Sequence, residues 1–591
     1  MDSKNPLGVQ IENELKDYFT RVVRIGEDWY SQERLVRRIG MFENKVYPTG
    51  KFDTEGNYKF WFDIISPRVS AEVKNIDFDT KDVFVYSNRE IDTLPNLVTN
   101  LKVGEYMKKT GQAEEINSSI EEGSARGNVV WKKVRGTYER VDGRNFFVIN
   151  QTAENLDESP VIERHELSAK QLRAKKEKWQ YIKEALEDCK TNSYSNSSED
   201  QDNESTTPFY EIYERNGEVA LKDLKEWKTE NGVKTDAVAE GDEDIYILAK
   251  VIGAGLKPDS SGTAEIKHVL FAEEMSKMPY EEYHRSAYKG KWYREGLYEL
   301  LFDLQIRANQ IGNQIAQGLE WSSKTIFVSP DNVGADNVIA DLMNGDIVKA
   351  STLSQVPVRM QGIDQLIADW NRVINQANEI ANSQEIVLGI TPASGTPLGT
   401  SRLLNQNAGK LFDFIREKIA IPFGAIFENW IVPSLIKDIK MQDVLRLTGD
   451  SDMMNRFYEL VVDSWYVNNL AEIGAHSEEV AETIKADKME ELVARPEIMI
   501  EGLKEVFQDY KPFVSVVITG ENTRLPQEIE DLATFIGLET DPIRRSAMIE
   551  LAMKKKSIDV AGLPKSDPEQ IQNPTQPSPS SPPDIEVGAE T

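Results

Sequence analysis

The sequence has few residues that bind metals or form disulfides: one cysteine and four histidines in 591 residues. The single thiol, Cys189, excludes a disulfide framework within the chain and fits assembly in a reducing cytoplasm. The histidines lie far apart in the sequence and have no partner at the spacing typical of metal ligands. We therefore expect no metal site, and ordinary surface or hydrogen-bonded roles for His165, His268, His284 and His476.

Motifs that would indicate catalysis are also missing. No segment matches the phosphate-binding loop Gly-x-x-x-x-Gly-Lys-Ser/Thr, and Gly253-Ala-Gly255 lacks the third glycine of a dinucleotide turn. Neither a cysteine–histidine pair nor a convincing pair of carboxylates is present for nucleophilic or acid–base chemistry. We expect a protein that is not an enzyme and that binds no cofactor.

Long apolar runs and positive charge are scarce as well. We find no run near about eighteen apolar residues and no apolar segment at the N-terminus, so neither a transmembrane span nor a signal peptide is expected. The formal net charge is −30, the reverse of what a protein needs to hold nucleic acid by its phosphates. The acidic balance fits a soluble surface, or a surface that must not adhere to a polyanion.

The residue pattern predicts a mixed α+β protein. Apolar residues recur at helical intervals over 11–41 and 167–188, and strand-like segments occupy 128–150, 209–213 and 245–251. Within 128–150 we place the turn at Asp142-Gly143. The polar residues 190–205 read as a mobile linker, and the proline-rich residues from Pro564 as a disordered tail.

Two long helices stand out, at 292–320 and 363–384. Each has one apolar stripe, but the other faces carry amides and small residues where a solvated helix would alternate Lys and Glu. Such faces favour close contact with other helices through hydrogen bonds. A buried central helix in a monomer would give the same pattern.

The loop Gly389–Thr400 contains no charged residue and is rich in glycine, proline and threonine. It could simply connect helices, or it could touch a charged polymer without binding it, because it offers neither cations nor aromatic rings. A helix follows over about 400–440, where Pro422 and Pro433 should kink or divide it. Beyond about residue 470 we expect mostly helix, interrupted by the β-like run Phe513–Thr519.

This order of parts resembles the portal protein of tailed bacteriophages, the ring at one capsid vertex through which DNA passes. The resemblance spans about 60–420. It is carried by Pro279–His284, Tyr293–Asn309, Trp321–Phe327 and Pro392–Pro397, with support from Trp61–Arg68 and Tyr210–Gly217.

The resemblance implies a division of the chain into eight parts. In chain order these are a wing at 1–291 with a flexible insertion at 190–207, a stem helix at 292–321, a clip at 322–360, a second stem helix at 361–385, a tunnel loop at 386–399, a long kinked helix with the second part of the wing at 400–475, a helical crown-like region at 476–560, and a disordered proline-rich tail at 561–591.

It also implies roles for particular residues. The residues of the tunnel loop facing DNA would be Thr391, Pro392, Ala393, Ser394, Gly395, Thr396 and Pro397. Stem packing between subunits would use Gln305, Asn309, Gly312, Asn313, Ala316, Trp370 and Asn378. The clip would dock partners through Lys324, Phe327, Asp331 and Asn332.

The partners that the resemblance implies are further copies of the chain, typically in a dodecamer, and double-stranded DNA held weakly and without sequence preference. Others are the terminase large subunit, the capsid protein and the head–tail adaptor or tail proteins. The protein would be assembled in the bacterial cytoplasm and reside in the virion, with no membrane. The alternatives are a virion structural protein that oligomerises without conducting DNA, and an enzyme whose site has no familiar motif.

If the loop faces DNA, changing Thr391, Ser394 or Thr396 to Lys should slow packaging or ejection while rings stay intact. Each new ammonium would hold a phosphate and add a salt-dependent trap to the path. Packaging rates and electron microscopy of the rings measure the two effects. Unchanged rates in all three variants would show that the loop does not face DNA.

Overall fold

The computed structural model describes most of the chain up to residue 516, all of it within one compact unit, Met1–Gly520. The described residues are 5–20, 23–25, 28–30, 32–47, 50–52, 56, 58–76, 78, 82–87, 93–191, 208–233, 245–256, 264–286, 290–323, 326–328, 354–356, 362–381, 398–437, 459, 462–463, 465–466, 478–494 and 510–516.

Helices and strands are both abundant in these residues, which confirms the α+β class. The helices are α1 (Pro6–Thr20), α2 (Gln32–Glu43), α3 (Ser66–Ile76), α4 (Thr93–Thr110), α5 (Gln112–Arg126), α6 (Ala169–Ala174), α7 (Ile182–Asp188), α8 (Leu221–Glu230), α9 (Leu297–Leu300), α10 (Phe302–Ser323), α11 (Ile363–Ile380), α12 (Leu398–Ile426), α13 (Val432–Lys437) and α17 (Glu478–Ala494), with a 3-10 turn η2 (Leu156–Glu158) and a π-helical turn η3 (Phe427–Ile431). The strands are β1 (Val23–Ile25), β2 (Asp28–Tyr30), β3 (Val83–Tyr86), β4 (Asn128–Val134), β5 (Thr137–Arg140), β6 (Phe146–Val148), β7 (Val161–Ser168), β8 (Lys190–Thr191), β9 (Phe209–Ala220), β10 (Tyr246–Leu256), β11 (Glu265–Glu274), β12 (Tyr280–His284), β13 (Ile326–Val328), β14 (Ser354–Val356) and β15 (Phe513–Val516).

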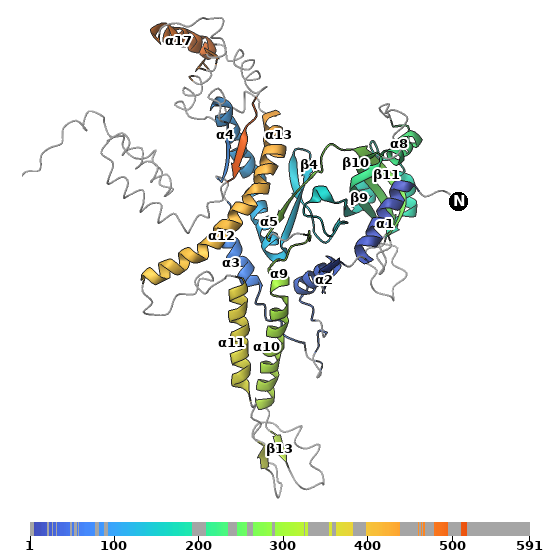
Figure 1. The fold of residues 1–591 in the computed structure, drawn as a ribbon, viewed down its shortest axis with the longest axis vertical. Helices are drawn as coiled ribbons and strands as arrows, with labels where there is room; N and C mark the ends of the chain where they lie inside the picture. The colour runs from blue at the N-terminus through green and yellow to red at the C-terminus, as the bar shows by residue number, and fades with distance from the viewer. Residues whose placement is uncertain are drawn as a thin grey trace, which may run out of the picture. The chain divides into compact units, whose positions relative to one another are not determined.

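The largest sheet has the order β11-β10-β9-β7-β6, with β8 paired to β9, and all its pairings are antiparallel. Its side chains alternate between two faces, as the period of a strand requires. Tyr213 and Val219 of β9 belong to a core cluster with α1 and α8, whereas Tyr210 and Ile212 belong to one with α6 and α7. Helices therefore pack on both faces, and Figure 1 shows α1 against this sheet.

A second sheet, β12-β4-β5, lies between two cores. Trp131 of β4 is in the cluster formed with α12, and the neighbouring Val130 is in the cluster formed with β6 and β7. The turn between β4 and β5 uses Arg135 and Gly136, both with positive φ (49° and 84°), as a two-residue hairpin turn requires. The predicted turn at Asp142-Gly143 is present, with the Asn145 N–H donating to the Asp142 carbonyl at 2.9 Å. It does not join paired strands, because β4 pairs with β5 and β6 pairs with β7.

Two predicted helices are divided. In 11–41, α1 ends at Thr20 and the hairpin β1–β2 precedes α2, since the β-branched residues around Val23 favour a strand. In 167–188, β7 extends to Ser168, which caps the short α6 through a capping box with Gln171. The predicted strands at 209–213 and 245–251 are confirmed and are longer, as β9 and β10.

The helix predicted over 400–440 is confirmed as α12, η3 and α13 in succession, and Pro422 lies inside α12 without ending it. By length and composition the stretch Phe412–Lys437 could cross a membrane, an indication absent from our reading of the sequence. In its most apolar window 44% of the residues are buried. Phe423 and Trp430 lie in one core cluster with Trp131, as expected of a core helix.

The β-like run near 513 forms β15, which pairs antiparallel with β3 from residue 83 onward. This pairing joins segments more than four hundred residues apart, and the sequence pattern gave no sign of it. Asp82 is buried just before β3 begins.

Changing Phe423 to Ala should lower the free energy of unfolding by about 3–5 kcal/mol, because it removes a ring from a close-packed core. The Phe423 side chain is fully buried and its ring lies 4.7 Å from that of Trp131. Ile421→Ala on the same helix is the matched control. Ile421 is 73% exposed, so its loss should change stability by less than about 0.5 kcal/mol. Urea denaturation measures both, and equal effects would contradict this view of the core.

Candidate functional site: the helix pair and its amide ladder

The helices α10 and α11 pack side by side around a shared apolar core that includes Ala308, Ile311, Val373 and Ala377 (Figure 1). They correspond to the helices predicted at 292–320 and 363–384, but the first begins later, with the short turn α9 before α10. The apolar stripe of each helix faces the other, as helical periodicity predicts.

Three side-chain amides of α10 hold an extended segment of the same chain. Gln305, Asn309 and Asn313, which we call the amide ladder, accept hydrogen bonds from the backbone N–H groups of Ile64 (2.9 Å), Phe62 (2.8 Å) and Phe60 (2.8 Å). Four residues of helix rise about 6.0 Å, and two residues of extended chain span about 6.6 Å. Every fourth helical residue therefore meets every second residue of the segment.

The ladder also returns hydrogen bonds to the segment. The Gln305 Nε2 group donates to the carbonyl of Phe62, and the Asn313 Nδ2 group donates to the carbonyl of Phe60 at 3.0 Å. Gln305 and Asn309 are almost completely buried, at 0% and 1% exposure. A buried backbone group without a hydrogen-bond partner costs folding free energy. The side-chain amides therefore supply this segment with the hydrogen bonds that a neighbouring strand supplies in a sheet.

The side chain of Phe62 fixes the segment in the groove between the helices. A Cβ atom on Gly312 would lie 2.4 Å from the Phe62 ring, so only glycine permits this approach. On the other helix, Trp370 meets Phe62 edge to face with ring centroids 5.5 Å apart.

Arg68, at the start of α3, continues the attachment to α11. Its guanidinium donates to the carbonyl of Ile64, to the carbonyl of Ile374 at 3.2 Å, and to the side chain of Asn378. The side chain is 5% exposed, and burial lowers its pKa. Residues 60 to 64 run antiparallel to α10, from Asn313 toward Gln305. Arg68, further along in the same direction, contacts the C-terminal half of α11. The start of α10 therefore lies beside the end of α11, and the two helices run antiparallel.

Six of the predicted stem residues have contacts within their own chain. Gln305, Asn309, Gly312, Asn313, Trp370 and Asn378 all contact residues 60–68, and their packing against another subunit stays a prediction. Ala316 is half-buried on α10. The signal we missed was the alternation of Phe60, Phe62 and Ile64, which marks a segment needing a partner every second residue.

The remaining predicted sites are mostly outside the described residues. This holds for the whole tunnel-loop set Thr391–Pro397 and for Lys324, Asp331 and Asn332 of the clip. Phe327 lies in β13, where its backbone pairs with Gln355 of β14.

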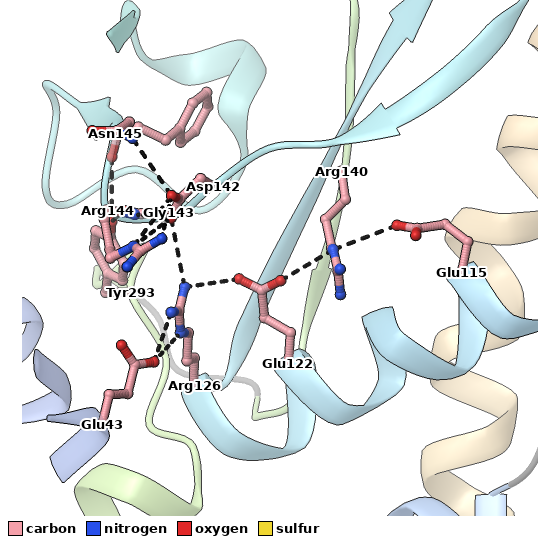
Figure 2. A network of polar contacts seen from close by, with 11 residues as sticks. Glu43, Glu115, Glu122, Arg126, Arg140, Asp142, Gly143, Arg144, Asn145 and Tyr293 are labelled. Carbon is pink, nitrogen blue, oxygen red and sulfur yellow. Dashed lines mark hydrogen bonds and ion pairs between the residues drawn. The ribbon is translucent and has the colours of Figure 1, made fainter. Parts of the chain in front are cut away.

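A separate polar network around Arg126, at the end of α5, joins α2, α5, β5 and the segment after β5 (Figure 2). Arg126 donates to Glu43 of α2 at 2.6 and 2.8 Å and to Glu122 at 2.9 Å, and it lies 3.9 Å from Asp142 after β5. Arg140 of β5 lies 3.4 Å from Glu122 on the other side. Burial acts to lower the pKa of Arg126, but Glu122 and Glu43 outweigh it and raise the pKa.

Beside this network is a cavity of about 250 Å³ with mainly apolar walls. Carboxylates outnumber guanidinium groups in the network, since Arg126, Arg140 and Arg144 face the four acids Glu43, Glu115, Glu122 and Asp142. An anion would therefore be repelled. The ion pairs of this network are better suited to holding α2 and α5 against the second sheet.

One histidine, His165, lies in a cluster with two glutamates. Glu163, His165 and Glu214 offer ligand atoms within 4.8 Å of one another, a group that sequence spacing could not reveal because β7 and β9 supply it together. Lys132 Nζ already lies 2.6 Å from Glu163 and 2.7 Å from Glu214, and Lys250 Nζ lies 2.7 Å from Glu214. The cluster is therefore better suited to joining the two sheets than to holding a cation.

Burial acts to raise the pKa of Glu214, but His165, Lys132 and Lys250 hold that pKa well below its usual range. Of the other histidines, His268 bonds to Asp188 at 2.8 Å and His284 to Asn128 at 2.7 Å, in the hydrogen-bonded roles expected. His476 is outside the described residues. Cys189 is fully buried, and burial raises the pKa of its thiol to about 12, so it is unreactive at neutral pH.

Comparisons with known proteins give distant structural similarities. No protein-family model matches the chain, and no curated protein matches its sequence. A chain from the neck of an empty gene transfer agent particle is 8% identical, covering 70% of this chain and 94% of its own length with a TM-score of 0.31. A chain from the virion of a native gene transfer agent particle is 9% identical, covering 68% and 87% with a TM-score of 0.29. Both TM-scores are too low to establish a shared fold.

Replacing Gln305 with Leu should lower the free energy of unfolding by about 2–4 kcal/mol, because the Ile64 N–H and the Phe62 carbonyl both lose a buried partner. Gln310→Leu is the matched control on the same helix, since Gln310 is exposed. Urea denaturation compares the two. A loss no larger in Gln305→Leu than in the control would contradict the role of the ladder.

Proposed function

We propose that this chain is a portal subunit: a structural protein of a tailed-phage particle that assembles into a ring at one capsid vertex and passes DNA. The proposal rests first on the order of segments that resembles the portal family, from Trp61–Arg68 to Pro392–Pro397. The antiparallel pair α10–α11, with β13 and β14 between them in sequence, supports the proposal, because the resemblance assigns a stem and a clip to these residues.

The observation that carries the proposal is the exposed surface of the helix pair. Large apolar side chains are exposed on it, with Leu319 52%, Ile367 45% and Ile380 37% exposed. Uncharged amides accompany them, namely Gln310, Gln314, Asn371, Asn375 and Gln376, all exposed. Apolar and uncharged residues together on exposed helices favour contact with another protein surface.

The charge distribution supports a channel rather than a DNA-binding surface. A net charge of −30 and an uncharged loop at 389–400 offer few sites for phosphates. Because each phosphate contact adds a salt-dependent barrier to movement, low affinity suits a conduit through which DNA is driven by a separate motor.

In this proposal the protein is not an enzyme. The motor is the terminase large subunit, which docks during packaging, and head–tail adaptor or tail proteins replace it afterwards. The capsid protein surrounds the ring. These partners come from the family resemblance alone, as does the typical subunit number of twelve.

Electron microscopy of the purified protein tests the proposal. We expect rings with a central hole, and a mass in solution that is a multiple of 67.0 kDa. A closed assembly without a hole would favour the alternative, a virion structural protein that does not conduct DNA. A protein that stays monomeric at every concentration would overturn both.

A further inference from the structure

A local excess of positive charge lies on α6, the turn that follows it and the start of α7. In a chain with a net charge of −30, residues 169–183 contain six lysines or arginines and one glutamate. The next residues of α7 are acidic, so the excess ends there. We call these cations the basic patch: Lys170, Arg173, Lys175, Lys176, Lys178 and Lys183. All six are exposed, and none forms an ion pair with another residue that the structure describes.

The basic patch belongs to an ordered surface. Leu172 of α6 and Ile182 of α7 are buried in the core on this face of the large sheet, together with Leu270 of β11. Between the two helices, the Gln180 N–H donates to the carbonyl of Leu270 at 2.8 Å. Because both helices and the turn are attached to the sheet, the cations are held near one another, and a ligand that binds them does not have to order a loose segment.

An exposed aromatic ring lies within the same surface. Tyr181 has a left-handed backbone conformation, with φ 50° and ψ 28°, which is uncommon for tyrosine. Its ring stacks on His268, with ring centroids 6.2 Å apart and planes 22° from parallel, and the residue is still 42% exposed. Nearby, the ammonium group of Lys175 lies 5.9 Å from the centre of the Trp179 ring. The exposed part of the Tyr181 ring is therefore available to another flat group.

Cations around an exposed aromatic ring suit single-stranded nucleic acid, because phosphates contact the cations while an unpaired base stacks on the ring. A duplex keeps its bases stacked inside and would use only the cations. An acidic polypeptide would also use the cations and has no base for Tyr181. The acidic remainder of the chain does not prevent binding, since exposed charges are largely screened beyond about 8 Å at physiological ionic strength.

We propose that the basic patch and Tyr181 bind single-stranded nucleic acid, DNA or RNA, without sequence preference. The cations contact successive phosphates, and Tyr181 stacks on one base. The site is a local exception to the acidic balance of the chain and uses no residue of the uncharged loop at 389–400. It does not depend on the proposed ring.

Fluorescence anisotropy with the full chain and labelled oligothymidine or oligouridine of about twelve nucleotides tests the proposal. If four or five phosphates are contacted, the logarithm of the affinity should fall with the logarithm of the salt concentration with a slope of about −3, at about 0.7 per contact. A duplex of equal length and polyglutamate should each bind about fivefold more weakly or worse, since neither offers a base to stack.

The alternatives give different results in the same experiment. Binding of either single strand, or of both, with this preference supports the proposal. A duplex bound as tightly as the single strands would overturn the stacking role of Tyr181 and with it the single-strand site. Polyglutamate bound as tightly would indicate a site for an acidic polypeptide and overturn the proposal. So would the absence of single-strand binding at about 50 mM salt, where phosphate contacts are strong.

Removing two cations tests whether binding occurs at the basic patch. Lys176→Gln combined with Lys178→Gln should weaken single-strand binding about tenfold or more at low salt and reduce the steepness of the salt dependence by about 1.4. The matched control is Lys108→Gln combined with Lys222→Gln, which changes the net charge equally at exposed positions of α4 and α8. Equal effects of the two double variants would show that overall charge, and not the patch, controls binding.

Two substitutions of Tyr181 separate stacking from charge. Tyr181→Asn removes the ring but tolerates the left-handed backbone, and it should weaken single-strand binding about five- to hundredfold, the effect of one stacked base. Its affinity for the duplex should not change. Tyr181→Phe keeps the ring and should bind single strands as the unaltered chain does. Undiminished binding by Tyr181→Asn, or an equal loss in both variants, would contradict stacking on this residue.

Discussion

The arrangement of the helix pair α10–α11 depends on hydrogen bonds between the side-chain amides of α10 and the backbone of residues 60–64. Two helices packed only through their apolar stripes could slide or rotate against each other, because apolar contacts are not directional. The amide ladder fixes the segment to α10 at every second residue, and Arg68 then fixes the same segment to α11. The pair is thereby tied to α3 and to the core behind it. The ladder also places residues 60–64 against one side of the helix pair, so that the other side remains available for contact with another molecule.

Buried charges serve a comparable purpose between the sheets. Lys132 reaches from β4 to carboxylates on β7 and β9, and Arg126 gathers carboxylates from α2 and α5 and from the segment after β5. A buried charge that loses its partner is strongly unfavourable, so these clusters disfavour any other packing of the two sheets. Their carboxylates match or outnumber their cations, which is why neither cluster suits a phosphate. Paired buried charges thus help to hold the two sheets and their helices in one arrangement.

How much could be predicted from the sequence differs between elements. The helix pair was predictable to within a few residues, because apolar residues at three- and four-residue intervals indicate an α-helix rather than a strand. The hydrogen-bonding partners of Gln305, Asn309 and Asn313 were not, since an amide signals the need for a partner without identifying it. The cluster around Glu214 was hidden for another reason: its members come from strands that are neighbours only in the folded sheet. The hairpin turn at Arg135-Gly136 was missed because Asp142-Gly143, which also forms a turn, is the stronger turn signal in isolation.

Site-resolved hydrogen exchange of residues 60–64 tests the central claim most directly. If the amide ladder holds this segment, the N–H groups of Phe62 and Ile64 exchange slowly, while those of Trp61 and Asp63, which point away from α10, exchange quickly. The alternation should persist under conditions in which the protein stays folded. Uniformly fast exchange over the five residues would contradict the account, because it would mean that the segment is not bound to the helix.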